Sequence, residues 1–211
     1  MSDIKDYRSD YGKQTLNRKD LPQNPIELFQ SWLQEAMDTI EKDANAFTLS
    51  TVASNGFPNS RVVLLKEVRK EGFVFFTNYN SQKGQEIDQN PQVSLNFFWP
   101  SLERQVRVQG LVEKVSEKES DAYFGTRPYK SQVGAWASEQ SIVINSRNTV
   151  VKRFALFTSK YLTRVPRPPH WGGYLVKPQK IEFWQGRNSR LHDRFVFQLN
   201  DSVWTANRLA P

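Results

Sequence analysis

The fold that this sequence predicts is decided by residues 46–77, AFTLSTVASNGFPNSRVVLLKEVRKEGFVFFT. Segments 46–53, 60–67 and 73–77 are rich in β-branched and aromatic residues, and two short polar turns that contain glycine separate them. Strand-forming segments joined by such short turns pair as antiparallel neighbours. This stretch therefore predicts a three-stranded antiparallel meander.

Segments on both sides of the meander extend the pattern. Before it, residues 25–40 place apolar side chains at steps of three and four, which predicts an amphipathic helix with Asn24 as its N-cap and Pro25 as its first residue. After it, we expect strands at 93–99, 104–115, 173–176, 181–184, 191–197 and 203–206, and helices at 81–89, 117–124, 128–136 and 151–160. Strands that follow one another this closely favour a closed or nearly closed barrel over βαβ units. The predicted class is mainly β with flanking helices.

Composition excludes several classes of protein. The chain has 211 residues, enough for one domain, and a formal charge of +7 from 29 basic and 22 acidic side chains. Its cations are spread out and form no run, so phosphate-bearing small molecules are favoured over a nucleic acid. It has no cysteine and no apolar segment of membrane-spanning length, and its first residues lack the apolar core of a signal peptide. We therefore expect a soluble cytoplasmic protein that binds neither membrane nor nucleic acid.

Two groups of cations near the meander are candidates for anion binding. Arg61 and Lys66 bracket an apolar strand, and they should point to opposite faces unless a bulge lies between them. The simpler explanation is a core strand with solvated ends. Ser81 and Lys83 begin a predicted helix, whose free N–H groups favour phosphate. An ordinary N-cap beside a solvated lysine explains that pair as well.

A third group consists of Tyr123, Arg127 and Ser131, which are spaced by four residues across the break that Pro128 makes. Two hydroxyl groups and a guanidinium near a helix N-terminus can form a phosphate pocket. An ordinary helix cap is the simpler alternative.

The fourth group is Arg190, His192 and Arg194, which we expect on one face of one strand, roughly 7 Å from one to the next. Such groups repel one another unless an anion lies among them, although a solvated barrel face remains equally open. Trp184 could offer an aromatic wall to a ligand, and Gln105 could form a hydrogen bond to a ring edge. Taken by itself, Trp184 is explained as well by a position in the core. The sequence has neither a Gly-rich nucleotide loop nor histidines spaced as a metal pair.

Eight segments carry a resemblance that spans about residues 7–211. They are RKDLPQNP (18–25), SRVVLLK (60–66), FFTNYNSQKGQE (75–86), RQVRVQG (104–110), YFGTRPYKSQVGAWASEQS (123–141), HWGGY (170–174), EFWQGRNSRLHDR (182–194) and RLAP (208–211). The combination of RLHDR after EFWQG with RLAP is specific. With these segments the chain resembles the pyridoxine/pyridoxamine 5'-phosphate oxidases, which are FMN-binding split-barrel proteins.

This resemblance implies a Greek-key antiparallel β-barrel in a single domain, residues 25–211, that includes a C-terminal dimerisation region and follows a flexible segment, residues 1–24. It also implies a homodimer with FMN at the interface, in sites built from both chains. FMN contacts would fall to Arg61, Val62, Val63, Leu64, Phe76, Thr77, Gln82, Lys83, Gln105, Gln140, Ser141, Trp184 and Arg194. Substrate contacts would fall to Arg8, Tyr11, Lys66, Tyr123, Arg127, Ser131, Arg190, Leu191 and His192, with Arg190 and His192 catalytic and no metal. Gln82 departs from the family pattern, which has arginine there.

The activity that the resemblance implies is FMN-dependent oxidation of pyridoxamine or pyridoxine 5'-phosphate to pyridoxal 5'-phosphate, with O2 as acceptor and H2O2 as product. Two alternatives remain: another split-barrel flavoprotein with a different substrate, and a non-catalytic FMN- or pyridoxal-phosphate-binding protein. The sequence leaves open the preference between amine and alcohol substrates and the effect of Gln82 on FMN affinity.

Overall fold

The computed structural model of this chain describes residues 3, 5, 10–40 and 42–211. In these residues the strands are β1 (Ala46–Val52), β2 (Pro58–Arg69), β3 (Gly72–Asn78), β4 (Gln92–Trp99), β5 (Arg104–Lys114), β6 (Trp171–Gln185), β7 (Asp193–Asn200) and β8 (Val203–Leu209). The α-helices are α1 (Pro25–Thr39), α2 (Gln82–Gln89), α3 (Glu117–Thr126), α4 (Tyr129–Ala137) and α5 (Arg147–Lys160). Short 3-10 turns are η2 (Arg18–Asp20), η3 (Pro100–Leu102) and η4 (Asn188–Arg190).

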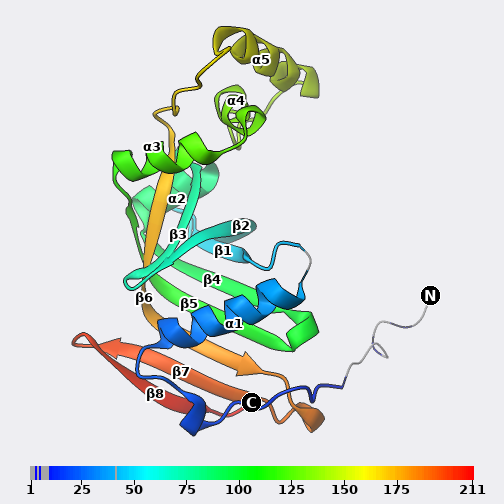
Figure 1. The fold of residues 1–211 in the computed structure, drawn as a ribbon, viewed down its shortest axis with the longest axis vertical. Helices are drawn as coiled ribbons and strands as arrows, with labels where there is room; N and C mark the ends of the chain where they lie inside the picture. Colours follow the sequence, from blue (N-terminus) through cyan, green and yellow to red (C-terminus); the bar gives the residue numbers. More distant parts are fainter. Residues whose placement is uncertain (1–2, 4, 6–9, 41) are drawn as a thin grey trace.

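The strands form an antiparallel barrel, which confirms the predicted fold. Their order in the sheet is β3-β2-β1-β4-β5-β6-β7-β8, and a further pairing of β3 with β6 closes the first six strands into a barrel. The meander β1–β2–β3 pairs as expected, and β4 returns to lie beside β1, which is the Greek-key order. The hairpin β7–β8 extends the sheet beyond β6 (Figure 1).

Strand β6 differs from the prediction, which divided it into two strands at residues 173–176 and 181–184. It is one strand of 15 residues, because its register against β5 shifts where Gly110 faces Pro178. Proline cannot donate to the ladder and is tolerated at such an irregularity. A Cβ on Gly110 would lie 2.3 Å from the carbonyl oxygen of Lys177, so only glycine permits this close approach. The length of β6 lets it pair with β3 at its start and with β7 at its end.

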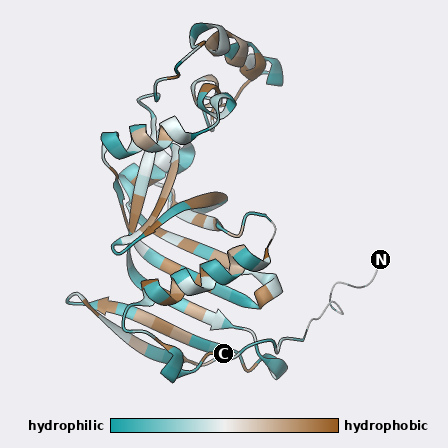
Figure 2. Cartoon of the chain, in the orientation of Figure 1, coloured by the Kyte–Doolittle hydropathy of each residue, from teal (hydrophilic) through white to brown (hydrophobic). Residues whose placement is uncertain are grey.

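Helix α1 lies across the barrel as the sequence predicts. The side chain of Asn24 accepts a hydrogen bond from the Ile26 N–H, and Pro25 begins the helix. The fully buried Phe29 packs edge-on against Phe73, which fixes the apolar face of α1 on the core. Apolar and polar residues alternate along several of the barrel strands (Figure 2), whereas β3 is buried along nearly its whole length.

Helices α3, α4 and α5 lie at the end of the molecule away from β7 and β8 (Figure 1). Phe124, Val133, Val165 and Trp171 form a second, smaller core beneath them. In the described residues, no helix has both the length and the apolar character needed to cross a bilayer.

Candidate functional site

A cavity of about 1070 Å³ opens between strands β2 and β3, the start of α2 and helices α3 and α4. It brings together predicted residues from five separate segments. They are Arg61, Val62, Val63, Leu64, Lys66, Phe76, Thr77, Gln82, Lys83, Tyr123, Arg127, Ser131, Gln140 and Ser141. The cavity is large enough for a cofactor together with a small substrate.

Arg61 and Lys66 both reach the cavity because β2 carries an irregularity. The pairing of β2 with β3 shifts register between Leu65 and Glu67, so one residue is left over at position 66. Without that shift the two cations would point to opposite faces of the strand. The sequence predicted opposite faces for Arg61 and Lys66 unless a bulge lay between them, and the structure has this bulge.

The start of α2 supplies an environment suited to phosphate. Ser81 caps the helix, since its side chain accepts from the Gly84 N–H. The amino group of Lys83 donates to Thr77 Oγ1 at 3.2 Å and to Gln140 Oε1 at 2.8 Å, and no carboxylate in the described chain forms an ion pair with it. Burial, together with the charge of Arg61, lowers the pKa of Lys83 to about 8. An anion beside Lys83 would relieve both effects.

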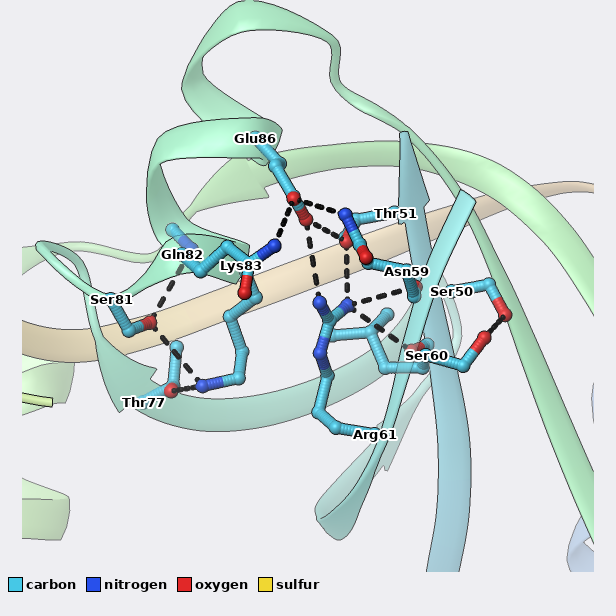
Figure 3. Close-up of polar contacts among 12 residues, drawn as sticks. Ser50, Thr51, Asn59, Ser60, Arg61, Thr77, Ser81, Gln82, Lys83 and Glu86 are labelled. Carbon is cyan, nitrogen blue, oxygen red and sulfur yellow. Dashed lines mark hydrogen bonds and ion pairs between the residues drawn. The ribbon is translucent and has the colours of Figure 1, made fainter. Parts of the chain in front are cut away.

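Arg61 lies on the other side of this end of the cavity (Figure 3). Its Nη1 donates to Thr51 Oγ1 at 2.5 Å and to the carbonyl oxygen of Asn59 at 3.2 Å. Its Nη2 lies 3.3 Å from a carboxylate oxygen of Glu86. Gln82 donates to the other oxygen of Glu86 at 2.9 Å. The side chain of Gln82 is thus directed to a neighbour on its own helix.

The far end of the cavity holds Arg127 in a strongly apolar setting. The guanidinium carbon lies 4.5 Å from the centroid of the Trp171 ring, and Nη1 is buried without a hydrogen-bond partner. Burial lowers the pKa of Arg127, which the nearby Tyr123 partly opposes. A buried donor without a partner is costly and rare in folded proteins. This arrangement indicates a site for an anionic group.

Aromatic rings form the wall beside Arg127. Tyr123 stacks on Phe76 with ring centroids 4.0 Å apart, and Phe76 stacks on Trp171 at 5.6 Å. The hydroxyl-bearing Ser131 lies in the first turn of α4, where its N–H donates to Pro128. The rings of Tyr123, Phe76 and Trp171 therefore lie nearly parallel, and the Trp171 ring faces the guanidinium.

A second group of predicted residues lies outside this cavity. Gln105, Trp184 and Arg194 are neighbours across β5, β6 and β7. The ring of His192 lies 4.6 Å from that of Trp184, and Tyr11 packs edge-on against both rings. Arg190 and Leu191 are beside His192 in the chain, whereas Arg8 lies outside the described residues.

The strand predicted through Arg190, His192 and Arg194 is wrong at its start. Strand β7 begins at Asp193, and Arg190 ends the turn η4 with a left-handed backbone, φ 61°. The backbone of Ser189 is also left-handed, so the chain bends sharply there. The side chains of Arg190, His192 and Arg194 therefore do not share one strand face. His192 Nδ1 accepts a hydrogen bond from the Arg187 N–H at 3.1 Å. Burial and the charge of Arg190 lower the pKa of His192, which favours the neutral ring.

Arg194 has an internal partner. Its Nη2 lies 2.7 Å from Glu182, a buried carboxylate that also contacts Arg107 at 3.4 Å. The second group therefore forms a compact surface patch, and Figure 1 shows β7 far along the molecule from α3 and α4. In the described part of the chain no three histidine, cysteine, aspartate or glutamate side chains gather as a metal site would need.

Two positions that contact candidate site residues escaped the sequence reasoning. Trp171 lies within HWGGY and supports Arg127, and Glu86 ends FFTNYNSQKGQE and contacts Arg61. Both lie in segments that carry the family resemblance, but no spacing rule connects Trp171 with Arg127 across more than forty residues. Their roles are visible only from the contacts.

Comparisons with known proteins agree with this geometry. Residues 33–161 match the family model described as pyridoxamine 5'-phosphate oxidase, and residues 171–211 match the pyridoxine 5'-phosphate oxidase C-terminal dimerisation region. A pyridoxine/pyridoxamine 5'-phosphate oxidase of Actinobacillus succinogenes is 53% identical over 209 residues, covering 99% of this chain and all of the relative. One of Neisseria meningitidis is also 53% identical over 209 residues, with the same coverage.

Solved structures agree with the fold. PhzG from Burkholderia lata, crystallised with tetrahydrophenazine-1-carboxylic acid, superposes with a TM-score of 0.90 at 27% identity, over 95% of this chain and all of that one. A pyridoxamine 5'-phosphate oxidase-related, FMN-binding protein of Nostoc punctiforme superposes with a TM-score of 0.71 at 17% identity, over 88% of this chain and 96% of that one.

Proposed function

The chain belongs to the pyridoxamine 5'-phosphate oxidase family, and from this premise we propose that it oxidises pyridoxamine and pyridoxine 5'-phosphate to pyridoxal 5'-phosphate with FMN as cofactor. One observation carries the proposal: four cations, Arg61, Lys66, Lys83 and Arg127, line one cavity. We assign Arg61 with Lys83 to one end and Lys66 with Arg127 to the other, since positions 61 and 66 would be about 16 Å apart along an extended strand and somewhat closer across the bulge at position 66. Such a cavity suits two phosphorylated molecules held side by side.

The residues at the first end suit the phosphate of FMN. Lys83 needs an anion to offset its burial, Arg61 offers a guanidinium, and the capped start of α2 faces the same space. Val62, Leu64 and Gln140 line the adjoining wall, where the ring system would lie. Bound FMN would supply the redox chemistry, accepting a hydride equivalent from the substrate and passing the electrons to O2.

The residues at the second end suit the substrate phosphate. Arg127 has a buried donor without a partner, and Lys66, Tyr123 and Ser131 line the same space. A phosphate there would satisfy the Arg127 donor with a charge-assisted hydrogen bond. This contact would fix the distance from the phosphate to the reacting carbon of the ring.

The surface patch around Trp184, His192 and Arg194 would complete the site when two chains associate. We place Arg190 and His192 of the partner subunit over the substrate ring, with the partner's Trp184 and the partner's Arg194 beside the flavin. In a two-fold dimer each chain would give its cavity to one site and its patch to the other. The neutral ring of His192 and the cation Arg190 would orient the substrate and stabilise charge that develops in the transition state. Tyr11 packs on this patch, consistent with a closing role for the N-terminal segment.

The proposed reactions balance without a further reactant. Pyridoxine 5'-phosphate and O2 give pyridoxal 5'-phosphate and H2O2, while the amine also consumes water and releases ammonia. A cytoplasmic location is part of this proposal.

A mixed-dimer assay tests both the activity and the shared site. Arg127→Ala disables the cavity and Arg190→Ala disables the patch, so each homodimer should be nearly inactive. Refolded together, the two variants should recover about a quarter of wild-type activity, because half of the dimers carry one intact site. No recovery would mean that the two groups do not act in one site.

Another flavoprotein activity remains the second candidate. A non-phosphorylated substrate would leave the Arg127 donor without a partner, so turnover of pyridoxamine as fast as of its phosphate would favour that candidate. Bound FMN that no B6 compound reduces would favour a carrier.

A further inference from the structure

Glu86 is a buried carboxylate at the end of the cavity that we assign to an anion. It is 5% exposed and lies on α2, one turn after Gln82. Its oxygens accept from Thr51 at 2.5 Å, Asn59 at 2.6 Å and Gln82 at 2.9 Å, and Arg61 lies 3.3 Å away (Figure 3). Burial alone would raise the pKa of Glu86, but these hydrogen bonds and the Arg61 charge outweigh it and hold the pKa below its ordinary value. Glu86 is therefore ionised at neutral pH.

The charge of Glu86 acts on both cations of this end. It contacts Arg61 directly, and it opposes the lowering of the Lys83 pKa that burial and Arg61 cause. With Glu86 the three side chains sum to +1, and without its charge they would sum to +2. Two cations that share a partly buried space repel each other, so a carboxylate between them stabilises the FMN-free protein.

The place of Arg61 does not depend on Glu86 alone. Its Nη1 is also held by Thr51 Oγ1 and by the carbonyl oxygens of Leu49 and Asn59. Removing only the charge of Glu86 should therefore leave the guanidinium in position and change the electrostatics.

We propose that Glu86 is a positioning residue that serves as an internal counter-anion for Arg61 and Lys83. In the FMN-free protein it offsets the charge of the two cations, and it opposes the phosphate of FMN when that group arrives. This inference rests on the proposed function, which supplies FMN as the occupant. It makes Glu86 a residue that stabilises the FMN-free protein and weakens cofactor binding.

The variant Glu86→Gln tests the inference, because the amide keeps the size of the side chain and its hydroxyl and amide neighbours can reorient. FMN affinity is measured by quenching of flavin fluorescence on the flavin-free dimer, with riboflavin, which lacks the phosphate, titrated in parallel. Asp88→Asn is the matched control: it removes the same charge from α2 at an exposed position paired with Lys114. Thermal melting of each flavin-free protein completes the set.

We expect Glu86→Gln to bind FMN on the order of tenfold more tightly, as removal of one nearby like charge predicts. Riboflavin affinity should not change, and the melting temperature of the flavin-free variant should fall. Asp88→Asn should leave all three quantities at wild-type values. A purely structural role would weaken FMN binding and lower stability together.

Unchanged or weaker FMN binding by Glu86→Gln, or equal shifts for FMN and riboflavin, would overturn the inference. Should the variant not fold alone, folding in the presence of FMN is expected to recover it, because the phosphate replaces the lost charge. Failure to fold with FMN as well would also overturn it. A wild-type protein that binds no FMN would instead reject the proposed function.

Discussion

At Arg127 we expect stability and function to respond in opposite directions to one substitution. Its guanidinium is buried against Trp171, and Nη1 has no hydrogen-bond partner. The substitution Arg127→Met keeps an unbranched apolar stem and removes the charge. We expect the stability of this variant without ligand to be close to or above that of the wild type, and its use of phosphorylated substrates to be much poorer.

The magnitudes follow from the contacts. Loss of a charge-assisted hydrogen bond to the substrate phosphate costs about 1.5–3 kcal/mol, which lowers kcat/KM by roughly 10- to 150-fold. Removal of the unsatisfied buried donor returns about 1–3 kcal/mol of stability, and loss of the cation–π contact with Trp171 takes back about 0.5–2 kcal/mol. The net change in the free energy of unfolding should lie between about 1 kcal/mol against the variant and about 2.5 kcal/mol in its favour.

Steady-state formation of pyridoxal 5'-phosphate and urea unfolding of the flavin-free protein measure the two quantities. Arg164→Met is the control, since Arg164 is exposed and lies outside the cavity lining. Non-phosphorylated pyridoxamine should be oxidised equally slowly by wild type and variant. A variant that loses stability by more than 2 kcal/mol, or whose kcat/KM falls equally for both substrates, would refute the reasoning.

Three further predictions follow from other parts of the site. Arg190→Ala should lower turnover more than FMN occupancy, as rates and flavin content of the purified dimer will show; equal losses would remove Arg190 from the substrate side. FMN affinity should weaken as pH rises from 7 through 8 to 9, because Lys83, with its pKa lowered to about 8, loses its proton there while the phosphate stays dianionic; Lys83→Met should abolish this dependence, and a slope that persists in the variant would point to another group. Gly84→Ala should cost about 1–3 kcal/mol in urea unfolding, since its Cβ would lie 2.0 Å from the carbonyl oxygen of Tyr79; wild-type stability would show that α2 can shift freely.

The elements of the barrel could be predicted because each carries a local signal. The meander, Asn24 as the cap of α1 and Ser81 as the cap of α2 all follow from period, turns and capping residues. The continuity of β6 could not, because the register shift opposite Gly110 depends on a partner strand more than sixty residues away.

The site shows the same division. Tyr123, Arg127 and Ser131 line one cavity, as their spacing across the helix break at Pro128 predicted, whereas only the resemblance brought Arg61 and Lys83 together. Arg190 was misplaced on a strand, since a left-handed turn at a serine and an arginine has no reliable local signal. The contacts of Trp171 and Glu86 join segments far apart in sequence, and only packing reveals them.

The account rests most directly on reduction of a bound flavin by a phosphorylated B6 compound. The decisive measurement is the absorbance spectrum of the purified dimer before and after pyridoxamine 5'-phosphate is added without oxygen. We predict a flavin band that bleaches, then returns with formation of H2O2 when air is admitted. A flavin band that stays unbleached, or no flavin even after reconstitution with FMN, would contradict the central claim.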